Sequence, residues 1–259
     1  MSSYLLVQMS DIHLTSSGSL DPDLRPRDNL LRGLALLQAA GLRPDAFVLT
    51  GDLADAGEAA CYDDLAAIVT QAAERSGAGV IYLPGNHDDR GMFRRHLAGG
   101  AGDGPLHQTC WRGGLRIIAL DSTVPGESYG MLDEQALGYL RGELRKPAPH
   151  GTVVALHHPP VPSPIEPMAR IALRDPGRLR DTIAGSDVRI VLCGHNHHAA
   201  LGTLGPVPVW VSPAVAYRAD VTRTRDFHRV PGAAFSRIDL PGGDGPTVTV
   251  IPIGAPPRP

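Results

Sequence analysis

Five short clusters in this sequence combine aspartate, asparagine and histidine, which bind transition metals through oxygen and imidazole nitrogen. In chain order they are Asp11-Ile12-His13, Gly51-Asp52, Gly85-Asn86-His87-Asp88, His157-His158 and Gly194-His195-Asn196-His197. In the last cluster, the alternation of an extended chain places both outer histidines on the same side. Seven side chains are therefore candidate metal ligands: Asp11, His13, Asp52, Asn86, His157, His195 and His197.

This number of ligands indicates two metal ions. Seven are too many for one tetrahedral or octahedral ion that keeps an open position, but they fit two ions if one carboxylate bridges them. Imidazole and oxygen ligands without thiolate favour manganese, iron, zinc or cobalt over calcium or magnesium. Two ions about 3.5–4 Å apart hold a hydroxide between them and clamp both oxygens of an in-line displacement at phosphorus.

Each cluster directly follows an apolar segment of strand length, bounded by polar or turn residues. The five segments are Tyr4–Met9, Ala46–Thr50, Gly79–Leu83, Thr152–Leu156 and Val188–Cys193, and Leu115–Leu120 and Val207–Val211 are further predicted strands. Ligands of α/β sheets bind beyond the carboxyl ends of the strands. We therefore expect the five loops to meet at one edge.

Helical patterns separate these strands. They cover Asn29–Ala40, Glu58–Ser76, Asp133–Lys146 and the shorter Pro176–Ala184. The third begins with acids and ends with bases, as the helix dipole favours. Strands that alternate with helices predict a layered α/β fold. Segments near Leu201–Val211 and Ser236–Ile253 have few helical signals between them and predict antiparallel strands late in the chain.

No repeat or low-complexity linker interrupts the chain, so we expect residues 1–259 to form a single domain. The 30 glycines and 24 prolines are scattered between the periodic segments. From about residue 241 the chain is rich in turn residues. Pro241–Pro246 predicts a turn, and Gly254–Pro259 predicts a frayed, mobile tail.

Composition excludes several classes of protein. With 42% hydrophobic and 20% charged residues, the chain is too apolar for a disordered protein, and a net charge of −3 argues against binding to polymeric nucleic acid. No apolar segment approaches the roughly 18 residues of a membrane span, and Tyr4–Met9 lacks the basic flank of a signal peptide. Cys61, Cys110 and Cys193 are widely spaced, which suits a reducing compartment. We expect a cytoplasmic protein.

The five clusters follow the order D-x-H, G-D, G-N-H-D, a lone His and G-H-x-H, which resembles the signature of the calcineurin-like metallophosphoesterase superfamily. The longer segments Ser10–Leu14, Thr50–Asp55, Gly85–Asp89 and Leu156–Pro160 are similar to those of the bacterial class III cyclic nucleotide phosphodiesterases. The resemblance extends to about residue 220. It implies an α/β fold built as a four-layer αββα sandwich of metallophosphoesterase type.

The resemblance also implies a role for each residue. Asp11, His13 and His197 would hold one metal, Asn86, His157 and His195 would hold the other, and Asp52 would bridge both. His87 would contact the substrate phosphate together with Asn86 and would stabilise or protonate the leaving oxygen. Asp55 resembles the acid that orients this histidine in the phosphoprotein phosphatases. The implied mechanism is in-line attack of a metal-bound hydroxide on a phosphodiester.

The expected substrate is a small-molecule phosphodiester, either 3′,5′-cyclic AMP or 2′,3′-cyclic nucleotides or both. A glycerophosphodiester or broad-specificity phosphodiesterase stays open, because the motifs specify metals and phosphate but not the alcohol. A protein phosphatase fits less well, because Asp55 precedes Ala56 and the third cluster ends in Asp88. A non-catalytic scaffold is a distant alternative, since no ligand is missing. Manganese or iron are the expected ions, with zinc or cobalt as alternatives, and relatives of this branch suggest a homodimer.

Some residues near the clusters have no assigned chemistry. His158 is expected to pack beside His157 or to support it, and His198 is treated in the same way. The loops Ser122–Gly130 and His158–Met168 are expected to border the pocket. The remaining histidines stand in helical or loop contexts without partners and are predicted to be ordinary: His96, His107, His150 and His228.

Overall fold

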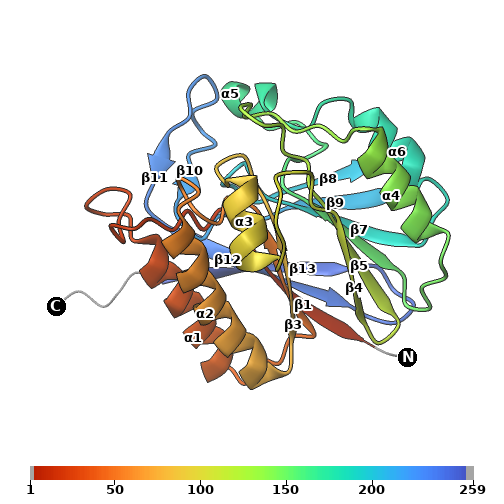
Figure 1. Ribbon diagram of the computed structural model, residues 1–259, viewed down its shortest axis with the longest axis horizontal. Helices are drawn as coiled ribbons and strands as arrows, with labels where there is room; N and C mark the ends of the chain where they lie inside the picture. Colours follow the sequence, from red (N-terminus) through yellow and green to blue (C-terminus); the bar gives the residue numbers. More distant parts are fainter. Residues whose placement is uncertain (1–2, 255–259) are drawn as a thin grey trace.

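The computed structural model describes residues 3–254, and its larger elements are two β-sheets with helices on their outer sides (Figure 1). The first sheet has the order β13-β12-β1-β2-β3. Its strands are β1 (Tyr4–Met9), β2 (Ala46–Thr50), β3 (Gly79–Leu83), β12 (Ala233–Leu240) and β13 (Thr247–Ile253). β1, β2 and β3 run parallel, while β12 pairs antiparallel with both β1 and β13.

The second sheet has the order β4-β5-β6-β7-β9-β8. Its strands are β4 (Gln108–Arg112), β5 (Leu115–Leu120), β6 (Thr152–Leu156), β7 (Val188–Cys193), β8 (Ala200–Leu204) and β9 (Val207–Val211). The four central strands are parallel, and the edge strands β4 and β8 are antiparallel to their neighbours. Parallel central strands are buried on both faces, which explains why β5 and β6 are buried at every position.

Three apolar clusters define four layers. The middle cluster joins the facing sides of the two sheets, with Leu6 and Val48 from the first sheet and Ile117 and Val153 from the second. The outer side of the first sheet packs against α1 (Pro26–Ala39), α2 (Ala59–Ser76) and α3 (Arg90–Leu97). The outer side of the second packs against α4 (Glu134–Leu144) and α6 (Pro176–Ile183). The predicted αββα sandwich is confirmed.

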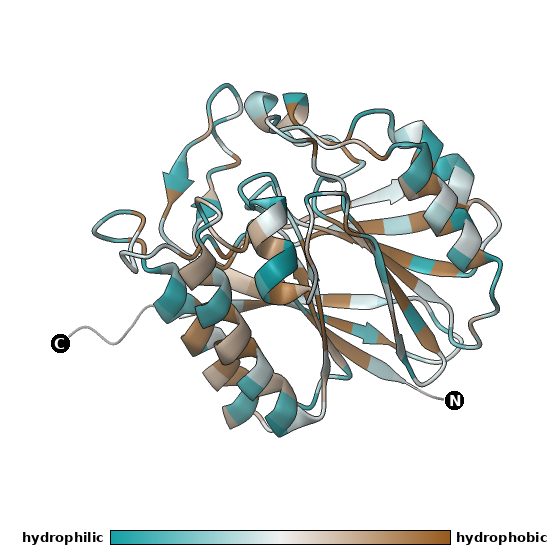
Figure 2. Ribbon diagram, in the orientation of Figure 1, coloured by the Kyte–Doolittle hydropathy of each residue, from teal (hydrophilic) through white to brown (hydrophobic). Residues whose placement is uncertain are grey.

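Local sequence signals account for the ends of the helices. Asp133 caps α4 by accepting a hydrogen bond from the Ala136 amide at 2.8 Å, and Asp89 caps α3 in the same way at Met92. α2 ends at Gly77, whose φ of 75° is the left-handed conformation that glycine adopts without strain. Along the helices, hydrophobic residues lie toward the sheets and polar residues toward solvent (Figure 2).

The seven strands expected from apolar segments are confirmed with the same first and last residues, and the four predicted helices are confirmed to within three residues at each end. The late antiparallel strands are confirmed as β8, β12 and β13. The sequence reading missed α3, β4, the short α5 (Glu166–Arg170), and the two-stranded ribbon of β10 (Arg218–Ala219) and β11 (Arg229–Val230).

The end of the chain contains the predicted turn between two of the predicted strands. Residues 241–246 form the expected turn, and residues 247–253 continue as strand β13, paired with β12. The expected frayed tail lies, beyond Gly254, outside the described residues. The single domain stays a prediction. Within residues 3–254, no helix is both long and apolar enough to span a membrane.

Candidate metal centre

The five clusters meet because β1, β2 and β3 of the first sheet and β6 and β7 of the second all end on the same side of the molecule (Figure 1). Backbone hydrogen bonds connect the loops that follow. The Asp11 amide donates to Gly51 O at 3.0 Å, and Gly194 N donates to His157 O at 3.0 Å. The His195 amide donates to both carboxylate oxygens of Asp11 at 3.0 Å, which joins the two sheets.

The ligand loops have an uncommon backbone conformation. Six non-glycine residues in the described part of the chain have positive φ, and five of them are predicted metal ligands. They are Asp11, His13, Asp52, His195 and His197, with φ between 49° and 72°. Non-glycine residues in this region carry strain and concentrate at functional sites. The strained backbone indicates that these loops are shaped to position the ligand side chains.

Two glycines allow ligand side chains to approach the backbone. A Cβ on Gly85 would lie 2.2 Å from Asp52 Oδ1, and a Cβ on Gly51 would lie 2.4 Å from His157 Nδ1. Both distances are far below van der Waals contact. Gly51 also has a φ of 88°, which a side chain would strain further.

One group of ligand atoms lies around His13. Its Nε2 is 3.2 Å from His197 Nε2 and 3.6 Å from Asp52 Oδ2. Asp11 Oδ1 lies 3.5 Å from His197 Nε2. These four side chains are buried and within reach of a single ion, so the geometry brings together the predicted first ligand set.

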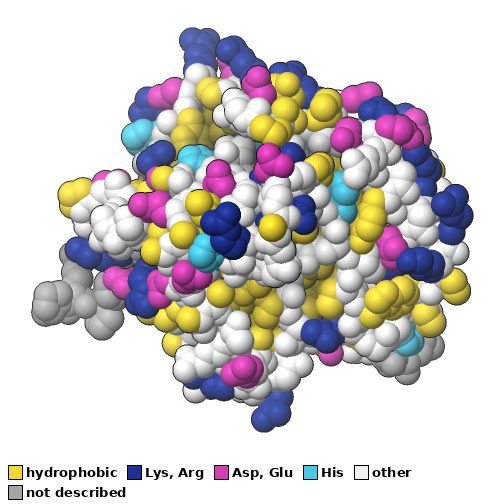
Figure 3. All heavy atoms as spheres, in the orientation of Figure 1, with side chains coloured by type: hydrophobic (Ala, Val, Ile, Leu, Met, Phe, Trp, Pro, Cys, Tyr) yellow, Lys and Arg dark blue, Asp and Glu magenta, His cyan; other side chains and the backbone are white. Residues whose placement is uncertain are grey.

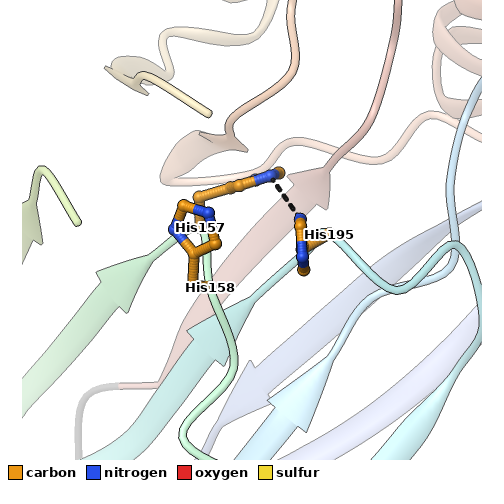
Figure 4. A group of neighbouring side chains, drawn as sticks. All are labelled: His157, His158 and His195. Atoms are coloured by element: carbon orange, nitrogen blue, oxygen red, sulfur yellow. Dashed lines mark hydrogen bonds between the residues drawn. The ribbon is translucent and has the colours of Figure 1, made fainter. Parts of the chain in front are cut away.

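A second group lies around His157. Its Nε2 is 3.2 Å from His195 Nδ1, 3.3 Å from Asn86 Oδ1 and 3.4 Å from Asp52 Oδ1. Figure 4 shows the rings of His157 and His195 directed toward one another from the ends of β6 and β7. Asp52 therefore presents one carboxylate oxygen to each group, which is the arrangement of a bridging ligand.

The outer ring nitrogens specify the tautomers. Nδ1 of His13 donates to Asp55 Oδ1 at 2.9 Å, Nδ1 of His157 to Thr50 O at 2.7 Å, and Nδ1 of His197 to Tyr217 O at 3.2 Å. In the neutral form of each ring, with the proton on Nδ1, Nε2 carries a lone pair that points into the site. Facing lone pairs and carboxylate oxygens repel one another, and a cation between them removes the repulsion. The donor set therefore fits bound metal ions.

Burial and opposite charges set the ionisation of the site. Burial disfavours charge on Asp52, but attraction to His157 and His13 outweighs it and holds the pKa of Asp52 well below its usual range. Burial likewise opposes charge on His157, yet Asp52 raises the pKa of His157 to about 9. Burial, with repulsion from His157, lowers the pKa of His195 to about 3. Burial raises the pKa of Asp11 to about 6.

His87 lies at the mouth of the site with 39% of its side chain exposed. Its backbone amide donates to Asp52 Oδ1 at 2.9 Å, and its Nδ1 donates to the carbonyl oxygen of Asp55 at 2.8 Å. The Asp55 carboxylate is 3.8 Å from His87 Nδ1 but 2.9 Å from His13. Asp55 thus contacts His87 through its backbone and His13 through its side chain.

His158 lies beside the candidate ligands His157 and His195, with a ring nitrogen within 4.8 Å of theirs, but its ring nitrogens have other partners. Its Nδ1 is 2.8 Å from Ser122 Oγ, and its Nε2 donates to Ser128 O at 3.2 Å, so both ring nitrogens are engaged. Its ring packs against His157 and His195 with centroids 4.9 and 4.7 Å away. His158 therefore connects the 122–130 loop to the ligands. The other histidines that the sequence reading set aside also lie outside both ligand groups: His96, His107, His150, His198 and His228.

Asp88 is a supporting residue that the sequence reading did not assign. Its buried carboxylate accepts hydrogen bonds from the amides of Gly85, Leu53 and Ala54, and from the Tyr62 hydroxyl at 3.0 Å. It joins the loop after β3 to the loop after β2 and so fixes the turn that carries Asn86 and His87. Asp88 is the last residue of the G-N-H-D motif, and its place in that motif was the available sequence signal for a role at the site.

Comparison with known proteins agrees with this geometry. A model of the calcineurin-like phosphoesterase family matches residues 4–199. The chain is 43% identical over 219 residues to a probable cyclic nucleotide phosphodiesterase of Rhodococcus erythropolis, covering 84% of this chain and 73% of that protein. It is also 43% identical over 225 residues to a cAMP/cGMP dual specificity phosphodiesterase of Mycobacterium tuberculosis, covering 85% and 70%.

A similar fold occurs in a solved structure. The dimetal phosphatase from Danio rerio superposes with a TM-score of 0.67 over 96% of this chain and 98% of that one. The two sequences are 14% identical, so the likeness concerns the fold.

Proposed function

This chain belongs to the calcineurin-like phosphoesterase family, and we propose that it is a dimetal phosphodiesterase whose substrates are cyclic nucleotides. The observation that carries the proposal is the position of Asp52, with one oxygen toward each of two imidazole groups. The substrate class is supported by the two relatives at 43% identity, which are named as cyclic nucleotide phosphodiesterases.

In this proposal Asp11, His13 and His197 hold one ion, Asn86, His157 and His195 hold the other, and Asp52 bridges them. Manganese or iron suits the mixed imidazole and oxygen donors best, with zinc or cobalt as alternatives. When bound, the two ions supply a nucleophile at neutral pH and neutralise charge on the phosphodiester. The lowered pKa values of His195 and His197 keep these two imidazoles neutral, which is the form that binds metal.

His87 is proposed as the acid for the leaving group. Donation from Nδ1 to the Asp55 carbonyl orients the ring and leaves Nε2 available at the exposed mouth of the site. A proton held at Nε2 passes to the alcohol oxygen as its bond to phosphorus breaks. Asn86 would contact both metal and substrate, and Asp55 would support the reaction by orienting His13 and His87.

The test is a comparison of initial rates after reconstitution with manganese. The panel contains 3′,5′-cyclic AMP, 2′,3′-cyclic AMP, glycerophosphocholine, bis-p-nitrophenyl phosphate and the monoester p-nitrophenyl phosphate. We expect the cyclic nucleotides to react fastest and the monoester to lag. If glycerophosphocholine reacts fastest, the substrates are glycerophosphodiesters rather than cyclic nucleotides. If no substrate reacts although two metals are bound per chain, the proposal is rejected. The homodimer and the cytoplasmic location stay predictions.

A further inference from the structure

The ribbon of β10 and β11, with its connecting residues 220–228, lies beside the candidate metal centre and projects from the sandwich (Figure 1). Arginines at positions 218, 223, 225 and 229 outnumber its two aspartates, at positions 220 and 226, and Lys or Arg side chains gather at its tip, at the top left of Figure 3. Its first strand is attached to the ligand loop, because Ala219 N donates to His197 O at 2.9 Å.

An aromatic stack connects the ribbon to the ligand His197. The buried Tyr217, directly before β10, stacks on the His197 ring with centroids 4.3 Å apart and planes at 26°. The Tyr217 carbonyl accepts the proton of His197 Nδ1. Phe227 of the ribbon meets the same imidazole edge-on at 5.9 Å. Tyr217 thus lies between a metal ligand and the ribbon.

Arg229, at the start of β11, lies over this stack. Its guanidinium carbon is 4.8 Å from the centroid of the Tyr217 ring, a cation–π contact, and the residue is exposed. Because Tyr217 also stacks on His197, a single aromatic ring lies between the Arg229 guanidinium and this metal ligand.

We infer that Arg229, held against Tyr217, binds the phosphate group of substrate and product at the mouth of the metal centre. The guanidinium presents a planar set of donors that matches phosphate oxygens. The ring contact restricts the side chain before binding, which reduces the entropy lost when phosphate binds. The inference rests on the proposed function for the nature of the ligand, and it adds a substrate-binding residue from beyond the five clusters.

The first experiment measures binding of inorganic phosphate to the full, manganese-reconstituted protein by titration calorimetry. We expect Arg229→Met to raise the Kd about tenfold, the size typical of losing a charged hydrogen bond. Arg229→Lys should recover part of the affinity, since it keeps the charge but not the planar donors. The matched control is Arg225→Met, an exposed arginine on the same ribbon with no ion pair or ring contact among the described residues.

Kinetics with bis-p-nitrophenyl phosphate give the second readout. Arg229→Met should raise KM by a similar factor with a smaller change in kcat and an unchanged metal content, and high salt should shrink the difference. Tyr217→Leu, which removes the ring, should weaken phosphate binding, and Tyr217→Phe, which keeps the ring, should weaken it less. Equal behaviour of Arg229→Met and Arg225→Met in both assays would overturn the inference. Failure of cyclic nucleotide hydrolysis with intact, Arg229-dependent phosphate binding would overturn the proposed function alone.

Discussion

Asp52 is the residue of the site whose carboxylate lies between the two groups of candidate ligands. It is buried, its two oxygens face different imidazole groups, and Gly85 leaves the space that its carboxylate occupies. The same side chain also accepts from the His87 amide, so it connects both candidate metal positions with the proposed acid. A single substitution should therefore affect metal binding and catalysis together.

Asp52→Asn should reduce metal content below two per chain and lower kcat/KM by on the order of 10³-fold or more, because the bound ions supply several kcal/mol of charge stabilisation. Plasma emission spectrometry and initial rates measure the two effects. Asp244→Asn, on the exposed turn between β12 and β13, is the control. Retention of two tightly bound ions would contradict the bridging role.

His87→Ala should lower kcat for cyclic AMP by about 10²–10⁴-fold, the usual contribution of an acid–base group, while both metals stay bound. The loss should be smaller with bis-p-nitrophenyl phosphate, since nitrophenolate leaves without a proton. His96→Ala, which removes a histidine paired with Asp63 away from the site, is the control. Equal losses with both substrates would argue against leaving-group protonation.

At the scale of elements, Arg116 of β5 connects strand, helix and loop. Its fully buried guanidinium donates to Thr152 Oγ1 of β6 and to the Asp187 carboxylate before β7. It also donates to the carbonyls of Glu143 and Lys146, at and just beyond the end of α4. One side chain thus holds α4 onto the second sheet, far from the ligand loops.

Arg116→Met should lower the free energy of unfolding by about 1–3 kcal/mol, because it removes a buried donor from the partly buried Asp187 carboxylate and from the Glu143 and Lys146 carbonyls. Urea denaturation monitored by circular dichroism measures the change. Arg141→Met removes an exposed arginine of α4 and should have a small effect by comparison. If both variants unfolded at the same urea concentration, the buried network would not stabilise α4.

At the scale of the whole molecule, the metal centre lies where both sheets end, so its ligands come from both halves of the sandwich. In the proposed function, bound ions would connect Asp11 and Asp52 of the first sheet with His157 and His195 of the second. The positive-φ ligand loops are strained, and the facing lone pairs repel. Metal binding should therefore stabilise the fold as well as supply chemistry.

Removal of metal with a chelator should lower the Tm. Ions at a thousand times their Kd stabilise the folded state by about 4 kcal/mol. For a chain of this size that corresponds to a fall on the order of 10 °C, measured by scanning calorimetry. The Tm of the Asp52→Asn protein should fall less when the chelator is added, because this variant binds less metal. An unchanged Tm in the wild type would show that the folded site does not bind metal.

The strands and the ligand clusters could be predicted from the sequence alone, because apolar segments and the polar residues that follow them are local patterns. Gly79–Leu83 and Val188–Cys193 could be delimited to the residue, and the clusters after them named most of the site. The edge strand β4 alternates weakly, and α3 is short and polar, so neither had a local signal strong enough to predict.

Which side chains contact one another depends on the tertiary structure and could not be predicted from local patterns. Asp55 was expected to orient His87 with its carboxylate, but the folded chain directs that carboxylate to His13. His158 contacts Ser122 and Ser128, Tyr217 stacks on His197, and Arg229 lies over the Tyr217 ring from a ribbon that no motif indicated. These contacts join residues far apart in sequence, and they depend on how two sheets pack. Periodicity records which face of a strand is buried, not which distant side chain lies against it.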